Sequence, residues 1–385
     1  MRLLAGVFFV LFAVLPGAAY ADCGEGRTPN ALAGFDDFAR AVMGDWQVPG
    51  LTLGVVQDGE TIYCAGYGFA DVENTTVATS DTMFAIGSIT KSFTVAGLGI
   101  LVDEGRLDWD AAVRDVLPGF ALADPLATAH TTARDMVTHR TGLARHDMLW
   151  YGSGLGADQL FEALRHLAPA APLRSAWQYN NLVVAAAGRI AEALSGQSWQ
   201  DFTRRHLLAP LGMMNTDFAP VDSDFARAKP YEKGDGGITR IPFYNMRAIA
   251  PAGAINSSVE DMLRYLAFHM MGASDLLSAG QTKAMQTPRV ALNDTPRYRA
   301  LGSTAYGMGF FVSTYRGQRI VWHAGGIDGF VALLAFLPDA GIGVVALSNL
   351  DRNPAPTILT RNLFDRLLGL KPLPWNDWVA SDYLA

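Results

Sequence analysis

The N-terminal part of the chain shows a helical pattern of apolar residues followed by two β-rich runs. Apolar side chains recur at helical spacing over residues 31–45, and the two runs within 51–70 are separated by Asp58-Gly59. An Asp-Gly pair between apolar runs is a strong signal for a β-hairpin. This region therefore predicts a helix followed by a hairpin.

The C-terminal part repeats the pattern with more strands. Four apolar, β-rich runs are separated by short turns that contain Gly or Pro, and they cover residues 309–315, 318–323, 330–337 and 342–348. Pro354 then opens a helical pattern that continues through Leu368. Strands at both ends of a chain with short turns predict one antiparallel sheet, built from the two ends and covered by the terminal helices.

The middle of the chain, about residues 81–299, changes to a helical period. Apolar residues recur at i, i+3, i+4 and i+7 over 88–104, 132–138, 157–167, 182–194, 199–207 and 258–270. Residues 217–247, rich in Gly, Asp, Pro and charge, predict a long surface loop. The expected fold class is α/β (α+β): an antiparallel sheet from about 31–80 and 300–370, flanked by helices, with a large mainly helical insertion.

The N-terminal segment is typical of a secretory signal peptide. Arg2 precedes an apolar run over residues 3–15, and a small-x-small sequence ends at Ala21. The alternative is an uncleaved membrane anchor, but Pro16 ends the run short of the ~20 residues that a span needs. We therefore expect cleavage after Ala21, and an exported domain, periplasmic or secreted, of residues 22–385 without a membrane span.

Export would place Cys23 and Cys64 in an oxidising compartment, where a disulfide between them can persist. The alternative is that Cys64, inside a strand-like run, is simply a buried small apolar residue. The two possibilities stay open at this point.

Composition excludes several classes of protein. Of the 385 residues, 50% are hydrophobic and 17% are charged, which is typical of a globular chain. The net charge is −7 without a run of basic residues, which disfavours binding to nucleic acid or to an anionic membrane. The spacing of His139, His146 and Asp147 matches no common zinc pattern. We expect no metal or other cofactor.

Three short motifs carry candidate chemistry. The first is Gly87-Ser88-Ile89-Thr90-Lys91, at the start of a predicted helix. Residues three apart share one helix face, so Lys91 lies beside Ser88. A hydroxyl at the positive end of a helix with an amine beside it suits a nucleophile. The alternative is that Ser88 only caps the helix.

The second motif is Tyr179-Asn180-Asn181, just before a predicted helix. A phenol in this position can serve as a base if nearby cations lower its pKa, and the amide of Asn181 can hold a substrate carbonyl. The alternative is that Tyr179 is a half-buried core residue and that the two Asn residues cap the helix.

The third motif is Trp322-His323-Ala324-Gly325-Gly326, at the end of a predicted strand. Glycines at a strand end let a substrate approach the backbone, and a free strand N–H can donate a hydrogen bond to an oxyanion. The motif therefore indicates a strand that lines a substrate-binding site.

Ser-x-x-Lys, Tyr-x-Asn and His-x-Gly, in this order and on these element types, resemble the serine β-lactamase and penicillin-binding-protein superfamily. The chain is similar to its class C β-lactamase-like branch, which includes D-aminopeptidases, DD-carboxypeptidase-like peptidases and family VIII esterases. Residues 138–143 and 251–257 also resemble segments of that branch. The resemblance covers about residues 31–370 and implies a β-lactamase/transpeptidase-like fold.

The resemblance also implies a role for each motif residue. Ser88 would be the acylated nucleophile, Lys91 its amine partner and Tyr179 the base. The other members would contact the substrate: Asn181, His323 and Gly325 as binding residues, and the backbone N–H groups of Ser88 and Gly326 as the oxyanion hole.

The chain departs from the family pattern at His323. The resemblance implies a Lys at this position, as true β-lactamases and penicillin-binding enzymes carry. That Lys helps to bind the substrate carboxylate and lowers the pKa of the Tyr. A His, with a pKa of about 6.5, is mostly neutral at neutral pH. The departure counts against efficient β-lactam hydrolysis.

The sequence thus predicts that residues 22–385 form an exported serine hydrolase domain, which acts on an amide or ester bond of a small molecule or peptide. Peptidase or carboxypeptidase-like, esterase and weak β-lactamase activities all stay open. The alternative is a non-catalytic penicillin-binding-like sensor or scaffold protein. A relative without activity would be expected to have lost Ser88, Lys91 or Tyr179, and all three are present.

Overall fold

The computed structural model describes residues 29–218, 227–272 and 274–384. The signal peptide predicted up to Ala21 and Cys23 lie outside these residues, so export and the pairing of Cys23 with Cys64 stay predictions. Cys64 itself is buried. None of the helices in the described ranges is both long and apolar enough to cross a membrane.

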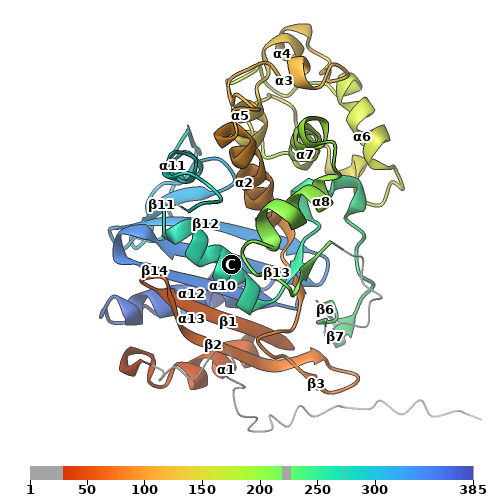
Figure 1. Ribbon diagram of the computed structural model, residues 1–385. Helices are drawn as coiled ribbons and strands as arrows, with labels where there is room; N and C mark the ends of the chain where they lie inside the picture. The colour runs from red at the N-terminus through yellow and green to blue at the C-terminus, as the bar shows by residue number, and fades with distance from the viewer. Residues whose placement is uncertain (1–28, 219–226, 273, 385) are drawn as a thin grey trace, which may run out of the picture.

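A nine-stranded antiparallel sheet forms the base of the molecule (Figure 1). The strand order is β3-β2-β1-β14-β13-β12-β11-β10-β9. The bounds are β1 (Gly50–Gln57), β2 (Glu60–Asp71), β3 (Thr76–Val77), β9 (Val290–Ala291), β10 (Ala305–Tyr306), β11 (Phe311–Tyr315), β12 (Gln318–Ile327), β13 (Phe330–Leu337) and β14 (Ile342–Ser348). N-terminal β1 pairs with C-terminal β14, with Leu51 opposite Ser348. The prediction of one sheet from both ends of the chain is confirmed.

The predicted hairpin joins β1 to β2. Its two turn residues, Asp58 and Gly59, have φ angles of +52° and +87°. Positive φ at both positions is what a two-residue hairpin turn requires, because only this twist matches the twist of the flanking strands. The Asp-Gly pair therefore sets the register next to the turn, where Gln57 lies opposite Glu60, and an irregularity between Val55 and Val56 shifts the register beyond it.

Strand β12 is longer than the sequence predicts. The expected run ends at His323, whereas pairing with β13 continues until Ile327 lies opposite Phe330. Glycine weakens a strand through its entropy, but the ladder offered by β13 holds this segment extended. Pairing with β11 ends at Trp322. Beyond Trp322, β12 therefore has one edge that β11 does not cover.

The segment predicted as a long surface loop, 217–247, contains a hairpin. Strands β6 (Tyr231–Gly234) and β7 (Gly237–Arg240) pair antiparallel in a separate small sheet. Composition alone misses this hairpin because its strands are short and carry no regular alternation of apolar and polar side chains, although Tyr231 at its start is buried. Residues 219–226 lie outside the described part.

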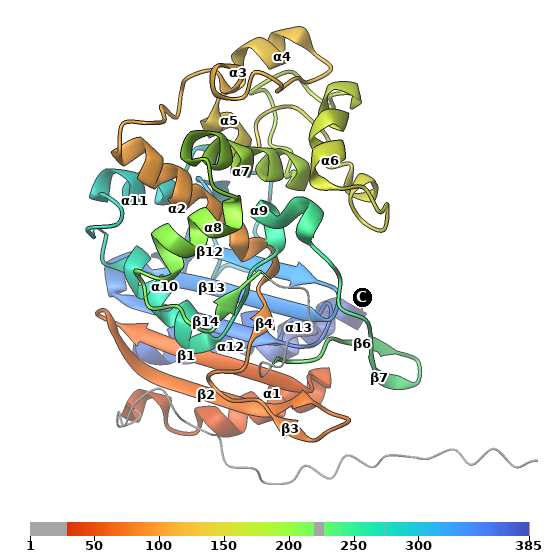
Figure 2. The ribbon, with the colours of Figure 1, turned by 45° about the vertical axis from the view of Figure 1, so that its right-hand side comes forward.

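Helices cover both faces of the large sheet. Helices α1 (Phe35–Trp46), α12 (Ala355–Leu367) and α13 (Trp375–Leu384) lie on one face, and α10 (Val259–Met270) packs on β1 and β14 from the other (Figure 1). The mainly helical part stands above the sheet (Figure 2). Its helices are α2 (Thr90–Asp103), α3 (Val113–Val116), α4 (Pro125–His130), α5 (Ala133–Val137), α6 (Ala157–Ala163), α7 (Asn181–Ser195), α8 (Trp199–Thr203), α9 (Ala250–Gly253) and α11 (Ala279–Gln286).

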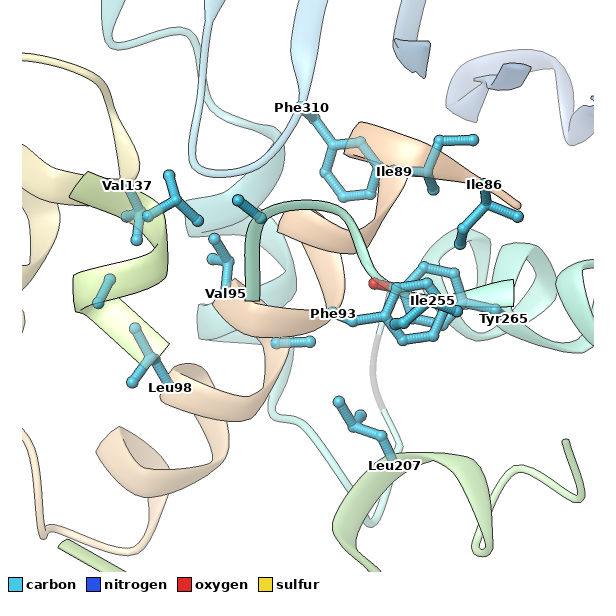
Figure 3. Close-up of a cluster of buried hydrophobic side chains, with 14 of the residues drawn as sticks. Ile86, Ile89, Phe93, Val95, Leu98, Val137, Leu207, Ile255, Tyr265 and Phe310 are labelled. Carbon is cyan, nitrogen blue, oxygen red and sulfur yellow. The ribbon is translucent and has the colours of Figure 1, made fainter. Parts of the chain in front are cut away.

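Helix α2 is the centre of the helical part. Every residue from Thr90 to Leu101 is buried, so this stretch has no solvent-facing side. Its side chains enter the cluster shown in Figure 3, where Phe93 stacks on Tyr265 with ring centroids 3.6 Å apart. This packing holds the start of α2 firmly, and the start of α2 carries Ser88.

Candidate active site

Ser88 lies in the 3₁₀ turn Gly87–Ile89 (η2), which leads directly into α2. Lys91, one turn further on, donates from its Nζ to Ser88 Oγ at 2.9 Å and to the Ala252 carbonyl oxygen at 2.8 Å. Lys91 is only 1% exposed. Burial, followed by the charge of Arg145, holds the pKa of Lys91 well below its usual range. An uncharged amine in this position can accept the hydroxyl proton.

Tyr179 faces the same pair from the start of α7. The centroid of its ring lies 4.8 Å from Lys91 Nζ. Burial raises the pKa of the phenol, whereas a hydrogen bond with Ser88 and the charge of Arg145 lower it. Tyr179 itself does not cap the helix, since the side-chain oxygen of Asn180 accepts from Val183 N at 3.0 Å.

His139, which follows α5, holds Tyr179 in place. Its carbonyl oxygen accepts from Gln178 N at 2.9 Å, and its Nδ1 accepts from Asn180 N at 3.2 Å. The rings of His139 and Tyr179 also pack together, with centroids 4.5 Å apart. Because Nδ1 accepts a hydrogen bond, the imidazole is neutral, and burial holds its pKa well below the usual range. The family-like stretch 138–143 was the only sequence signal for this role.

His323 is buried in β12 and is also neutral. Its Nδ1 lies 2.6 Å from the Ala324 carbonyl oxygen, which can only accept, so Nδ1 carries the proton. Its Nε2 then accepts from the hydroxyl of Tyr306 at 3.2 Å. Burial, with the charge of Lys91 as a second cause, lowers the pKa of His323 to about 3. His323 therefore contributes no positive charge at neutral pH.

The backbone of β12 passes directly beside η2. A Cβ atom added to Gly87 would lie 2.8 Å from Gly326 N, and one added to Gly325 would lie 3.1 Å from Ser88 N. The N–H groups of Ser88 and Gly326 therefore lie in one small region next to the Ser88 hydroxyl. Two such backbone donors are what an oxyanion hole requires.

Replacing Gly325 by Ala tests this close approach. The new methyl group would fall 1.8 Å from the Ile86 carbonyl oxygen, a backbone atom that cannot move without shifting Ser88. We expect Gly325→Ala to lower the free energy of unfolding by about 1–3 kcal/mol, as overpacking does. Gly326→Ala is the matched control, since its Cβ would meet nothing nearer than Phe330 O at 4.0 Å. Equal melting temperatures for the two variants would argue against the packing described.

Arg145 is a site residue that none of the three motifs contains. Its guanidinium carbon lies 5.2 Å from the centroid of the Tyr179 ring. Asp147 holds it through an ion pair of 2.7 Å at Oδ2. The other oxygen of Asp147 accepts from Asn181 Nδ2 at 3.2 Å and from Trp150 Nε1 at 2.9 Å. The network therefore joins Arg145 to the amide of the second motif.

The loop after Asp147 crosses from the helical part to the sheet. The hydroxyl of Tyr151 donates to Asp328 Oδ2 at 2.6 Å, and its ring stacks on Tyr244 with centroids 4.6 Å apart. Asp328 directly follows β12. The loop thus lies next to the C-terminal end of β12, where β11 does not cover the edge of that strand. Within the described ranges, no group of three or more His, Cys, Asp or Glu side chains could hold a metal ion.

Known proteins align with most of this chain. The chain is 32% identical to an unguisins hydrolase of Aspergillus campestris, over 90% of this chain and 68% of that protein. It is 29% identical to penicillin-binding protein 4 of Amycolatopsis lactamdurans, over 86% of this chain and 87% of that one. The chain thus spans about two thirds of the length of the fungal hydrolase.

Solved structures and a family model agree with these relatives. An octameric penicillin-binding protein homologue from Pyrococcus abyssi matches with a TM-score of 0.79 at 25% identity, over 89% of this chain and 78% of that one. The Beta-lactamase family model matches residues 35–367. Since this match takes in the sheet and the helical part together, the chain belongs to the Beta-lactamase family.

Proposed function

We propose that this protein is a serine hydrolase that forms an acyl-enzyme on Ser88 and cleaves an amide or ester bond. The contact of 2.9 Å between Ser88 Oγ and the buried Lys91 Nζ carries the proposal. A serine hydroxyl becomes a good nucleophile when a base lies within hydrogen-bonding distance and a third group orients that base. The Ala252 carbonyl oxygen orients Lys91 here. The relative from Aspergillus campestris, named a hydrolase, supports the same reaction class.

The reaction would proceed in two steps. Ser88 Oγ attacks the carbonyl carbon, and its proton passes to the pair formed by Lys91 and Tyr179. The N–H groups of Ser88 and Gly326 stabilise the oxyanion. When the bond to the leaving group breaks, Tyr179 returns the proton to the amine or alcohol. A water molecule then attacks the acyl-enzyme in the same way, which releases the acid and restores Ser88.

The uncovered edge of β12 supports an extended acyl group as substrate. Ala324 and Gly326 are exposed, and they lie beyond the point where pairing with β11 ends at Trp322. An exposed strand edge that no neighbouring strand covers can bind an amide-containing chain as an added strand does. Asn181, at the start of α7, is buried and donates from its Nδ2 to Asp147, so its contact with the substrate stays a proposal. Neutral His323 offers no charge to a substrate carboxylate, which favours esters and simple amides over β-lactams.

A non-catalytic sensor or scaffold would have no use for an uncharged amine beside a serine. Burial of Lys91 costs free energy that the rest of the fold must offset. Groups whose pKa burial shifts this far are concentrated at catalytic sites. The environment of Lys91 therefore favours an enzyme over the non-catalytic alternative.

Covalent labelling tests the proposal. A fluorophosphonate should add a single label to the folded chain, on the peptide that contains Ser88, as mass spectrometry would show. Hydrolysis of p-nitrophenyl esters, D-amino acid amides and nitrocefin, measured in parallel, would then identify the bond that is cleaved. A folded protein that takes up no label and hydrolyses none of these compounds would contradict the proposed function.

A further inference from the structure

We propose that Arg145 supplies the positive charge at Tyr179 that the third motif does not carry. The inference rests on the proposed function, because it concerns the proton transfer that Tyr179 performs there. The mechanism requires a positive charge near Tyr179 that the three motifs do not supply. Tyr179 must give up its proton or share it with Lys91, and a buried phenol resists becoming negative unless a cation stands close by.

Several titratable or charged groups surround Tyr179, from every element packed against it. They are Ser88 of η2, Lys91 of α2, His139 after α5, Arg145 and Asp147 of the following loop, Tyr306 of β10 and His323 of β12. Tyr306 donates its hydroxyl to His323 and is uncharged. This set, drawn from the described residues, leaves four groups that could bear a positive charge.

Two of the four are neutral for geometric reasons. His139 accepts a hydrogen bond at Nδ1, and His323 accepts one at Nε2, so neither ring can hold a second proton without losing that bond. Lys91 is the proton partner of Ser88 and alternates between the two forms during the reaction. A guanidinium stays charged at any pH at which the protein is folded. Arg145 is therefore the permanent cation of the site.

The position of Arg145 is fixed by bonds rather than left to a free side chain. Asp147 holds its guanidinium at 2.7 Å, and Asp147 is itself held by Asn181 and Trp150. The side chain of Arg145 is 54% exposed, so solvent screens part of its charge, and the carboxylate of Asp147 offsets another part. Arg145 thus acts through Tyr179, as a positioning residue that sets the charge around the base.

The geometry predicts opposite effects for the two partners. Without Arg145 the pair Tyr179–Lys91 loses its proton at higher pH, and without the negative charge of Asp147 it loses the proton at lower pH. Arg145 lowers the pKa of both members of the pair. The direction of each effect is therefore the same whichever member holds the proton.

The experiment compares Arg145→Gln, Arg145→Lys and Asp147→Asn in the full chain. Asn at position 147 keeps an Oδ1 for Asn181 and Trp150, and it replaces the charged Oδ2 that binds Arg145 by a neutral amide nitrogen. The readout is the rate of Ser88 labelling by an uncharged fluorophosphonate as a function of pH. We expect the midpoint of the rising limb to move up by about half to one pH unit in Arg145→Gln and down in Asp147→Asn. Arg145→Lys should stay close to wild type, because the charge remains.

Each result decides the matter. Complete labelling of Ser88 with unshifted midpoints, or with both variants shifted in the same direction, would overturn the role of Arg145 and leave the proposed function standing. Failure of folded wild-type protein to label at Ser88 would overturn both. If Arg145→Gln proves unfolded by circular dichroism, Arg145→Met takes its place, and its midpoint must rise for the proposal to stand.

Discussion

Replacing Ser88 by Ala should lower the hydrolysis of a p-nitrophenyl ester by about 10³-fold or more, the scale on which loss of a catalytic serine acts. The substitution removes the attacking oxygen, so no acyl-enzyme can form. Fold and stability should be little changed, because Ala suits the start of a helix and Lys91 keeps its hydrogen bond to the Ala252 carbonyl oxygen. Steady-state rates and labelling of the same preparation would measure the effect.

Ser92→Ala is the matched control for this variant. Ser92 lies in the same helix, but its Oγ donates to the Ile89 carbonyl oxygen and accepts from the Tyr265 hydroxyl, within the core. Its loss removes both hydrogen bonds and leaves the buried Tyr265 hydroxyl without an acceptor, so it should cost about 1–3 kcal/mol of stability and leave turnover unchanged. A Ser88→Ala protein that retained wild-type turnover would show that another residue is the nucleophile.

Tyr179→Phe should lower turnover by about 10² to 10⁴-fold, the contribution of a positioned general acid–base. The change removes one oxygen and keeps the ring that packs on His139, so the protein should fold as before. Labelling of Ser88 should slow by a similar factor, because activation of the hydroxyl depends on the same proton transfer. Rates of both reactions at several pH values would separate lost catalysis from lost binding.

Tyr383→Phe serves as the comparison for that experiment. Tyr383 is 63% exposed on α13, on the other side of the sheet from the helical part. It loses the same oxygen without any link to the site. If Tyr179→Phe behaved like Tyr383→Phe, the view of Tyr179 as a half-buried core residue would be correct and its role as base would be wrong.

The sequence predicted those features of the structure that depend on residues close together along the chain. The Asp58-Gly59 turn needs only its own two residues, and the pairing of Ser88 with Lys91 needs only one turn of helix. The sheet from both chain ends also followed from strand patterns, because few arrangements can bury that many apolar strands. These features depend on spacing along the chain, which the sequence displays.

The rest depends on contacts between distant segments. Arg145 acquires its role from a ring 34 residues further on, and no motif marks it. His323 is neutral because Tyr306 and the Ala324 carbonyl oxygen bind its two nitrogens, a pairing that spacing does not indicate. The extension of β12 past Gly325 likewise comes from the neighbouring strand and not from its own composition.

The pairing of β1 with β14 bears on when the catalytic machinery can form during synthesis. Ser88 is translated early. Strand β12, which brings Gly326 beside Ser88, and strand β14, which pairs with β1, are translated much later, near the C-terminus. Contacts of such large sequence separation form slowly, since the loop they close must be ordered first. A nascent or C-terminally truncated chain therefore contains Ser88 and Lys91 but no complete site. We expect hydrolytic activity only after strands β12 to β14 have been made and paired.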